Sequence, residues 1–425
     1  MAVSKKGKIL SWAFFDFGNS AFSTLVLTFV YNTYYTTSIA VDPNVGAAQW
    51  GMAVAVASVM IAVLSPVLGA AADVFALKKR FMGVAIGIGA LATAFLYFPE
   101  KGQEWWALSF FVVAVVATEL SIVFNNAFLP ELAPKSEAGR VSGFAFALGY
   151  AGGLLCLLIA MNGFVVSPDK GEPWFGLSWE GGQSVRATSL LVAVWLVVFS
   201  IPVMVFLKDK KRSGSSRGMV DVTRQSFVRL KDTFFHLRDY RTLFGLLLAR
   251  LFYNDGLVAI FSFGGVYATV VFGFSFQDLM IFGIALNVCS MIGALAFSFI
   301  EDRIGSRMTI AITLVALFAS TLLAVFVESK TAFWGCAIVI GLFIGPNQSA
   351  SRAYLSRLTP PDKANEFFGF YAFSGKATAF IGPVLYGWVS FSFESQRAGM
   401  LVIPVLFLVG FVLLMLRTRS DCPEG

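Results

Sequence analysis

Twelve long apolar runs, separated by short polar connections, set the strongest limit on how this chain folds. Most are about 20 residues or longer, which is the length that an α-helix needs to cross a bilayer. Strictly alternating segments of about ten residues, which indicate a membrane barrel, do not occur. Because backbone polar groups in lipid must bond within their own segment, the pattern predicts an all-α membrane protein with twelve transmembrane helices. The approximate limits of the runs are 10–37, 48–72, 81–98, 105–128, 140–166, 186–207, 242–271, 277–300, 308–327, 331–355, 365–391 and 397–416.

The composition excludes a water-soluble protein. Hydrophobic residues make up 57% of the 425 residues and charged residues only 13%, whereas soluble domains carry about 25% charged residues. The four cysteines stand apart from one another and His236 is the single histidine, so no zinc, iron–sulfur or multi-histidine site is expected. No glycine-rich run ends in Gly-Lys-Ser or Gly-Lys-Thr, so direct drive by ATP is not expected. The inventory predicts neither an enzyme nor a bound cofactor.

The basic residues indicate how the chain is oriented in the membrane. Most of the 32 Lys and Arg residues fall at the N-terminus, at the C-terminus and in every second loop. Since basic loops stay in the cytoplasm, both termini are predicted to be cytoplasmic. The formal charge of +7 is then a topology signal, and no nucleic-acid partner is expected. The basic residues assigned to the opposite side are Lys101, Lys170, Arg186, Lys330 and Arg397.

A polar, basic stretch from Lys208 to Arg241 divides the chain near its middle. Its first part is rich in Lys, Ser and Gly, which is typical of a flexible linker. Its second part places Phe227, Leu230, Phe234 and Leu237 at helical spacing, which favours a short amphipathic helix on the inner leaflet. We therefore expect an N-terminal bundle over 1–207, a cytoplasmic linker over 208–241 and a C-terminal bundle over 242–425.

The two halves repeat in sequence. Residues 127–134 match residues 353–360, and the register continues from Ala138 with Ala364 to Gly149 with Gly375. Asp73, after the second span, is echoed by Asp302, after the eighth. Two six-helix bundles related by a parallel pseudo-repeat explain this pattern.

The first span holds a carboxylate. Asp16 is followed by Asn19, Ser20 and Ser23, which share its helical face. Asp16 also interrupts the apolar run after the basic N-terminus, and no small-residue cleavage site follows, so we expect a retained span rather than a signal peptide. A carboxylate facing lipid costs several kcal/mol. This face therefore either lines a solute path, or Asp16 is an interfacial residue that caps the helix or touches lipid headgroups.

Other polar residues deep in the spans are candidates for solute binding or ion coupling. They lie on the fourth, seventh, tenth and eleventh spans. A structural ion pair of Glu119 with Arg250 or Lys376 is the alternative for those three. Charged residues at span ends are instead predicted to form gates. The binding candidates are Asp16, Asn19, Glu119, Asn126, Arg250, Asn254, Asp255, Asn347, Gln348 and Lys376, and the gate candidates are Asp73, Arg140, Asp302, Arg303 and Arg307.

These features resemble a known superfamily. Six plus six spans, a basic central loop and the motif Asp302–Arg307 between spans eight and nine are similar to the major facilitator superfamily. Within it, Phe15–Phe22, Asn126–Leu132 and Gly139–Phe144 resemble the vacuole-effluxer branch, which includes fungal vacuolar amino-acid exporters and many bacterial members. The resemblance implies that spans one, four, seven and ten line a central cavity. It also implies a monomer and, for a bacterial member, the inner membrane.

The function expected from these observations is secondary active transport of a small polar solute by alternating access. The cavity candidates carry both signs of charge, which suits a zwitterion such as an amino acid or short peptide, and the resemblance implies efflux. Burial in an apolar cavity disfavours a charged carboxylate, so Asp16, Glu119 or Asp255 is predicted to carry a coupling proton. Two alternatives stay open: an exporter of amphiphiles, lipids or drugs, and a non-transporting membrane sensor or scaffold.

Overall fold

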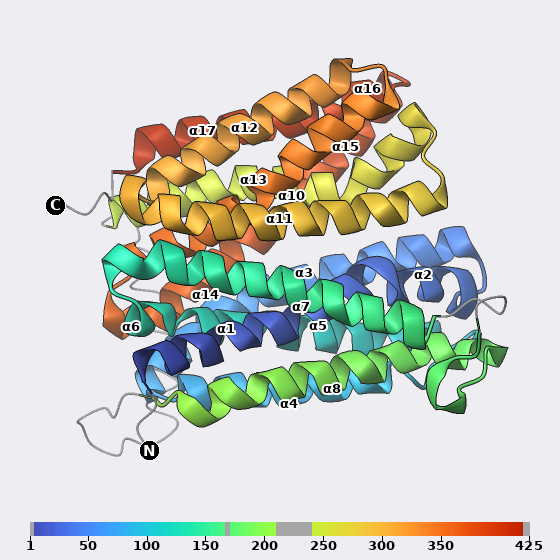
Figure 1. The fold of residues 1–425 in the computed structure, drawn as a ribbon, viewed down its shortest axis with the longest axis horizontal. Coiled ribbons are helices and arrows are strands. Elements are labelled where there is room, and N and C mark those ends of the chain that lie inside the picture. The colour runs from blue at the N-terminus through green and yellow to red at the C-terminus, as the bar shows by residue number, and fades with distance from the viewer. Residues whose placement is uncertain (1–3, 166–170, 210–239, 420–425) are drawn as a thin grey trace. The chain divides into compact units, whose positions relative to one another are not determined.

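The computed structural model describes residues 4–165, 171–209 and 240–419, and every regular element in these ranges is a helix (Figure 1). Contacts between residues divide the chain into two compact units. The first contains Met1–Leu64, Ala76–Asn125 and Leu148–Ser213, and the second contains Ser65–Phe75, Asn126–Ala147 and Gly214–Gly425. The boundaries predicted at 207 and 242 stay a prediction. The predicted amphipathic helix, with Phe227, Leu230, Phe234 and Leu237, and His236 lie outside the described residues.

The first unit is built on helices from the N-terminal half. The helix α8 packs on α1 and on α4 (Figure 1). Two helices continue into the second unit, α3 at its C-terminal end and α7 at its N-terminal end. The elements are α1 (Lys5–Ala21), η1 (Phe22–Phe29), α2 (Tyr31–Tyr34), η2 (Tyr35–Ile39), α3 (Pro43–Phe75), α4 (Lys78–Phe95), α5 (Glu104–Asn126), α7 (Ala138–Gly163), η5 (Trp174–Gly176), η6 (Glu180–Gly182) and α8 (Gln183–Phe206).

The second unit holds the C-terminal helices. The helix α13 packs on α11 and α12, and α17 packs on α10 and α12 (Figure 1). The elements are α6 (Leu129–Leu132), η3 (Lys135–Glu137), α10 (Arg241–Phe272), α11 (Phe276–Ile304), α12 (Ser306–Phe326), α13 (Lys330–Leu358), η8 (Pro361–Lys363), α14 (Ala364–Lys376), α15 (Ile381–Ser392), α16 (Gln396–Met400) and α17 (Val402–Arg417).

Each of the twelve predicted spans has a helical counterpart in the described residues. Ten of these are long and apolar enough to cross a membrane on length and composition. The other two have local causes. The helix α4 has only 18 residues and begins with Lys78-Lys79-Arg80, and the eleventh span is broken into α14 and α15. The prediction of an all-α membrane protein is confirmed.

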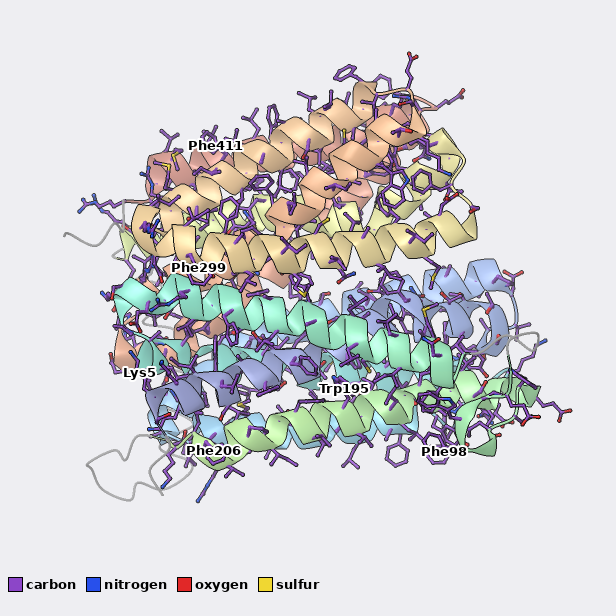
Figure 2. The ribbon with its side chains drawn as sticks, viewed as in Figure 1. Lys5, Phe98, Trp195, Phe206, Phe299 and Phe411 are labelled. Carbon is purple, nitrogen blue, oxygen red and sulfur yellow. The ribbon has the colours of Figure 1, made fainter. Side chains whose placement is uncertain are left out.

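The outward-facing side chains fit a lipid environment. Phe206 on α8 and Phe299 on α11, both labelled in Figure 2, expose 41% and 57% of their surface. Many other Val, Leu, Ile and Phe residues are equally exposed, and a water-soluble monomer rarely carries apolar surface on this scale. Lipid tails, rather than water, are the solvent that suits these helices.

Small residues and aromatic rings fix the first span in its unit. The ring of Phe17 stacks on Trp195 of α8, with centroids 5.5 Å apart, and meets Phe199 at 4.6 Å (Figure 2 labels Trp195). On another side, Gly152 of α7 lies so close to the Phe17 carbonyl that a β-carbon there would clash. Close approach through small residues is a usual device of helix packing in membranes. The helix α1 is thus held by both α7 and α8.

Candidate functional site

The eleventh span is interrupted where it faces α10. The helix α14 ends at Lys376 and α15 begins at Ile381, and we call Ala377–Phe380 the α14–α15 break. The interruption lies about one turn before Gly382-Pro383, a pair that favours a bend in a helix. The Ala379 amide, which would reach Gly375 O in a continuous α-helix, lies 3.4 Å from Lys376 O instead. Asn254 Nδ2 donates to Gly375 O at 2.8 Å and replaces the lost bond.

Arg250 lies beside this break. Its Nη1 donates to Tyr371 O at 2.8 Å and to Ser374 Oγ at 3.2 Å. Its guanidinium carbon sits 3.7 Å from the centroid of the Tyr371 ring, a cation–π contact. A β-carbon at position 375 would clash with Nη1, so this glycine makes room for the guanidinium.

The Arg250 guanidinium is a half-buried cation on α10. Within the described part of the chain, no carboxylate oxygen lies within 4 Å of it. Nη1 alone is engaged, and Nε and Nη2 donate to no described protein group. A cation at membrane depth is expensive unless an anion or water balances it. The planar fork of an arginine matches a carboxylate with two parallel hydrogen bonds, so this edge is suited to an anionic group of a solute.

Asp255 supplies the opposite charge on the same helix. Only 2% of its surface is exposed, and its Oδ1 accepts a hydrogen bond of 3.2 Å from Thr378 Oγ1, inside the break. Among the described residues, no cation forms an ion pair with it. The structure therefore brings Arg250, Asn254 and Asp255 to the α14–α15 break, which Lys376 borders as the last residue of α14.

A second polar cluster lies in the first unit, between α1 and α5. Asn125 Nδ2 lies 3.4 Å from Asp16 Oδ1, and Trp12 Nε1 donates to Asn125 O at 2.7 Å. The cap of α1 is Ser4, whose side chain accepts from the Gly7 amide, so Asp16 is not the capping residue. Asn19 is buried, with 6% of its surface exposed. Asp16, on the predicted polar face of span one, thus meets span four.

The remaining binding candidates lie in separate places. Glu119 is half-buried on α5 in the first unit, whereas Arg250 and Lys376 belong to the second, so their pairing stays a prediction. On α13, Asn347 is fully buried and donates to Thr313 Oγ1 of α12 at 2.9 Å, and Gln348 is half-buried.

Two aspartates cap helices across the sequence repeat. Asp73, near the end of α3, accepts from the amides of Asn365 at 3.3 Å and Glu366 at 2.9 Å, at the start of α14. A carboxylate at a helix N-terminus satisfies free amides and complements the helix dipole. Figure 1 shows α14 in orange.

Asp302, near the end of α11, repeats this arrangement on α7. It accepts from the amides of Gly139 at 3.0 Å and Arg140 at 3.2 Å. In the repeat, Ala138 matches Ala364, so these two amides are the counterparts of those that Asp73 binds. Asp73 and Asp302, both predicted gate residues, therefore cap equivalent helices of the two sequence repeats.

We expect Asp302→Asn to loosen the start of α7 from α11. Charge-assisted caps contribute about 1–2 kcal/mol, so a buried thiol at this contact should be labelled roughly tenfold faster. Ser298 suits the thiol, because it is 1% exposed and packs against Gly143 of α7. The measurement is the labelling rate of Ser298→Cys with and without Asp302→Asn. Arg303→Gln, at an exposed position, is the control. Equal labelling rates of Ser298→Cys with Asp302→Asn and with Arg303→Gln contradict the capping role.

Comparison with known proteins identifies the chain. The family model described as "Vacuole effluxer Atg22 like" matches residues 47–421. The chain belongs to this family.

Relatives and solved structures agree with this assignment. The uncharacterized MFS-type transporter YxiO of Bacillus subtilis is 29% identical over 95% of this chain and 93% of its own length. Autophagy-related protein 22 of Saccharomyces cerevisiae is 23% identical, over 77% of this chain and 68% of its own length. The Cryptococcus neoformans protein of that name is 24% identical over 53% of this chain, which spans less than half of that relative, 43%.

The fold is that of the major facilitator superfamily (MFS). The transporter FucP in its outward conformation superposes with a TM-score of 0.72 at 14% identity, over 98% of this chain and 99% of FucP. The human organic anion transporter MFSD10 gives 0.73 at 14% identity, over 97% and 100%. The predicted fold class and the predicted family are confirmed, and this Atg22-like protein is an MFS-type membrane transporter, not an enzyme.

Two arginines of this Atg22-like protein that were not among the candidate site residues contact the predicted residues Asp302 and Asn126. Arg357 is 5% exposed, pairs with Asp302 Oδ1 at 3.1 Å and donates to Lys135 O at 2.8 Å. Arg352 is 2% exposed and donates to Asn126 Oδ1 at 3.1 Å. It also bonds both the hydroxyl and the carbonyl of Ser142.

A signal for them was present in the repeat. Arg352 and Arg357 stand at the positions that match Asn126 and Glu131. The gate role of Arg140, Arg303 and Arg307 stays a prediction, and the structure shows their contacts. Arg140 offers its backbone amide to Asp302 while its side chain pairs with Glu137 at 3.3 Å, and Arg303 is exposed. Arg307 donates to Met415 O and Thr418 Oγ1 at the end of α17.

Proposed function

We propose that this protein is a secondary transporter that exports a small zwitterion, an amino acid or a short peptide, by alternating access in exchange for protons. The observation that carries the proposal is the Arg250 guanidinium, which has an unengaged edge and no carboxylate partner in the described residues. A carboxylate of the solute completes its coordination. The opposite charge of Asp255, one and a half turns further along α10, suits the ammonium group or a proton.

The α14–α15 break supports a binding role for this region. Discontinuous helices in secondary transporters commonly form the substrate and ion sites, because their free backbone groups replace water around the bound solute. Here the break contacts α10 through Asn254 and Thr378. The break therefore brings a cation and a carboxylate to an interruption of the helical backbone.

Of the three predicted proton carriers, we favour Asp255. It is almost fully buried, and its described hydrogen-bond donor is a neutral hydroxyl. These surroundings favour the neutral carboxylic acid over the charged carboxylate. Asp16 instead lies beside an amide of Asn125. Proton uptake at Asp255 would then compete with the ammonium of the solute, which couples the two in opposite directions.

The setting of the transporter completes the proposal. The distribution of Lys and Arg supports cytoplasmic termini, and the description of the family as an effluxer supports export. We place the protein in a bacterial inner membrane as a monomer, with the proton as coupling ion and with neither a resident cofactor nor a nucleic-acid partner.

A ligand screen tests the substrate class. Free amino acids and dipeptides should raise the thermal unfolding midpoint of the purified protein. At a hundredfold excess over Kd, the ligand adds about 2.7 kcal/mol to the free energy of unfolding. Their amidated derivatives, which lack the carboxylate, should not. Stabilisation by lipophilic cations or lipids, with no response to any amino acid or dipeptide, contradicts the proposal and supports an exporter of amphiphiles.

A further inference from the structure

The first membrane span leaves the α-helical register in two stretches, η1 and η2. The Val30 amide donates to Leu25 O and the Ala40 amide to Tyr35 O, each five residues back and each at 2.9 Å. The Thr28 hydroxyl likewise reaches Ser23 O, at 2.8 Å. Such π-helical turns are rare, usually single, and frequent at functional sites. A π-helical stretch of eight residues, such as η1, therefore requires a structural or functional explanation.

The π-helical register changes which side chains share the exposed face. In an α-helix, the positions that follow Ser23 on its face are Leu27 and Val30. Where bonds reach five residues back, the next position on that face is the fifth, which is Thr28. Thr33 lies beyond η1, in the short α-helical segment α2. Ser23, Thr28, Thr33 and Thr37 are all exposed, whereas Leu25, Val26 and Tyr31 are buried.

A polar row results that runs the length of the span. We call Asp16, Ser20, Ser23, Thr28, Thr33 and Thr37 the hydroxyl row; its first two members are half-buried and the others exposed. It extends from Asp16, in α1, to Thr37, in η2, and so follows most of the first span. Hydroxyl groups that only face lipid gain nothing from being aligned in a row.

The three threonine hydroxyls of this row are already engaged as donors. Thr28, Thr33 and Thr37 give their single O–H to Ser23 O, Phe29 O and Thr33 O, at 2.8, 3.0 and 2.8 Å. Each hydroxyl oxygen keeps its capacity to accept. The row ends at the carboxylate of Asp16, which also accepts. Its chemistry therefore suits groups that donate hydrogen bonds and carry positive charge.

We propose that the π-helical register of span one exists to expose the hydroxyl row as a wetted path, which conducts the N–H-bearing, cationic end of the solute. The proposal rests on the transport function proposed above and adds the part of span one that recognises the ammonium group. It assigns Thr28 and Thr33, rather than Leu27 and Val30, to the path.

Thiol labelling tests this assignment without a known substrate. Single cysteines are introduced at Thr28, Thr33, Leu27 and Val30 in the full-length protein, in lipid vesicles, after the native cysteines are replaced by alanine. The thiolate, which forms in water and not in lipid, attacks a membrane-impermeant thiol reagent. We expect labelling of Thr28→Cys and Thr33→Cys to be at least about tenfold faster than that of Leu27→Cys and Val30→Cys. We expect a cationic reagent to label them faster than an anionic one of equal size.

Two outcomes overturn the proposal. One is equal labelling at all four positions, or faster labelling at Leu27 and Val30. The other is labelling of Thr28→Cys and Thr33→Cys only by a lipid-soluble maleimide, which means that the row faces lipid. If Thr33→Cys does not fold, the comparison of Thr28→Cys with Leu27→Cys decides alone. If the row is labelled but no amino acid is transported, the proposed function is refuted and the wetted path is retained. If amino acids are transported but the row is not labelled, the wetted path is refuted and the proposed function is retained.

Discussion

Replacement of Arg250 by glutamine is expected to abolish high-affinity transport of the zwitterion. Glutamine can keep one hydrogen bond to Tyr371 O or Ser374 Oγ, which Arg250 Nη1 now makes, but it loses the charged edge that faces the solute. Removing one member of a desolvated charge pair costs about 2–5 kcal/mol, which is roughly 30- to 3,000-fold in affinity. The measurement is the concentration dependence of radiolabelled amino-acid uptake into proteoliposomes.

Two further variants separate recognition from folding. Arg250→Lys keeps the charge without the planar fork, so it should retain transport with an affinity reduced by a smaller factor. Arg303→Gln, which removes an exposed arginine near the end of α11, should behave as wild type. Equal transport by Arg250→Gln and Arg303→Gln would show that the solute does not bind at Arg250.

Asp255→Asn is expected to separate transport from the proton gradient. Asparagine has nearly the shape of the neutral carboxylic acid and can still accept from Thr378 Oγ1, which lies 3.2 Å from Asp255 Oδ1. It cannot gain or lose a proton. Exchange of solute across the membrane should therefore continue, while accumulation driven by a pH gradient should fall to the level of protein-free vesicles.

Matched variants make this result specific. Thr378→Val removes only the hydroxyl partner, which is worth about 0.5–1.5 kcal/mol, so it should reduce gradient-driven accumulation several-fold without abolishing it. Asp16→Asn and Glu119→Gln test the other two predicted carriers in the same assay. If all three carboxylate variants keep gradient-driven accumulation, the proton is not the coupling ion.

The spans were predictable from sequence because hydropathy and length alone determine which segments can cross a bilayer. The interruption of the eleventh span was not. Gly382-Pro383 indicated a bend, yet the helix breaks at Ala377–Phe380, where Asn254 of another helix competes for Gly375 O. Such a competition depends on tertiary contacts. The π-helical register of span one was equally hidden, because apolar residues mixed with Ser and Thr suit an α-helix as well.

The charged members of the site were visible in the sequence and their surroundings were not. Arg250 and Asp255 stand out as ionisable residues in an apolar run. Their neighbours, Tyr371 O, Ser374 and Thr378, are a backbone carbonyl and two hydroxyls, which occur throughout such a sequence and carry no signal. The helix caps were predictable only in part. The sequence repeat paired Asp73 with Asp302, but only the coordinates show the amides that each carboxylate binds.

Solute-driven proton movement in proteoliposomes tests the central claim most directly. Purified protein is reconstituted with a pH-sensitive dye inside the vesicles, and amino acids, dipeptides and their amidated derivatives are added in turn. The account predicts that a zwitterion with a free carboxylate changes the internal pH, that its amidated derivative does not, and that Arg250→Gln and Asp255→Asn both abolish the signal. A signal that is the same in wild type and in both variants, or one that only carboxylate-free amphiphiles produce, would contradict it.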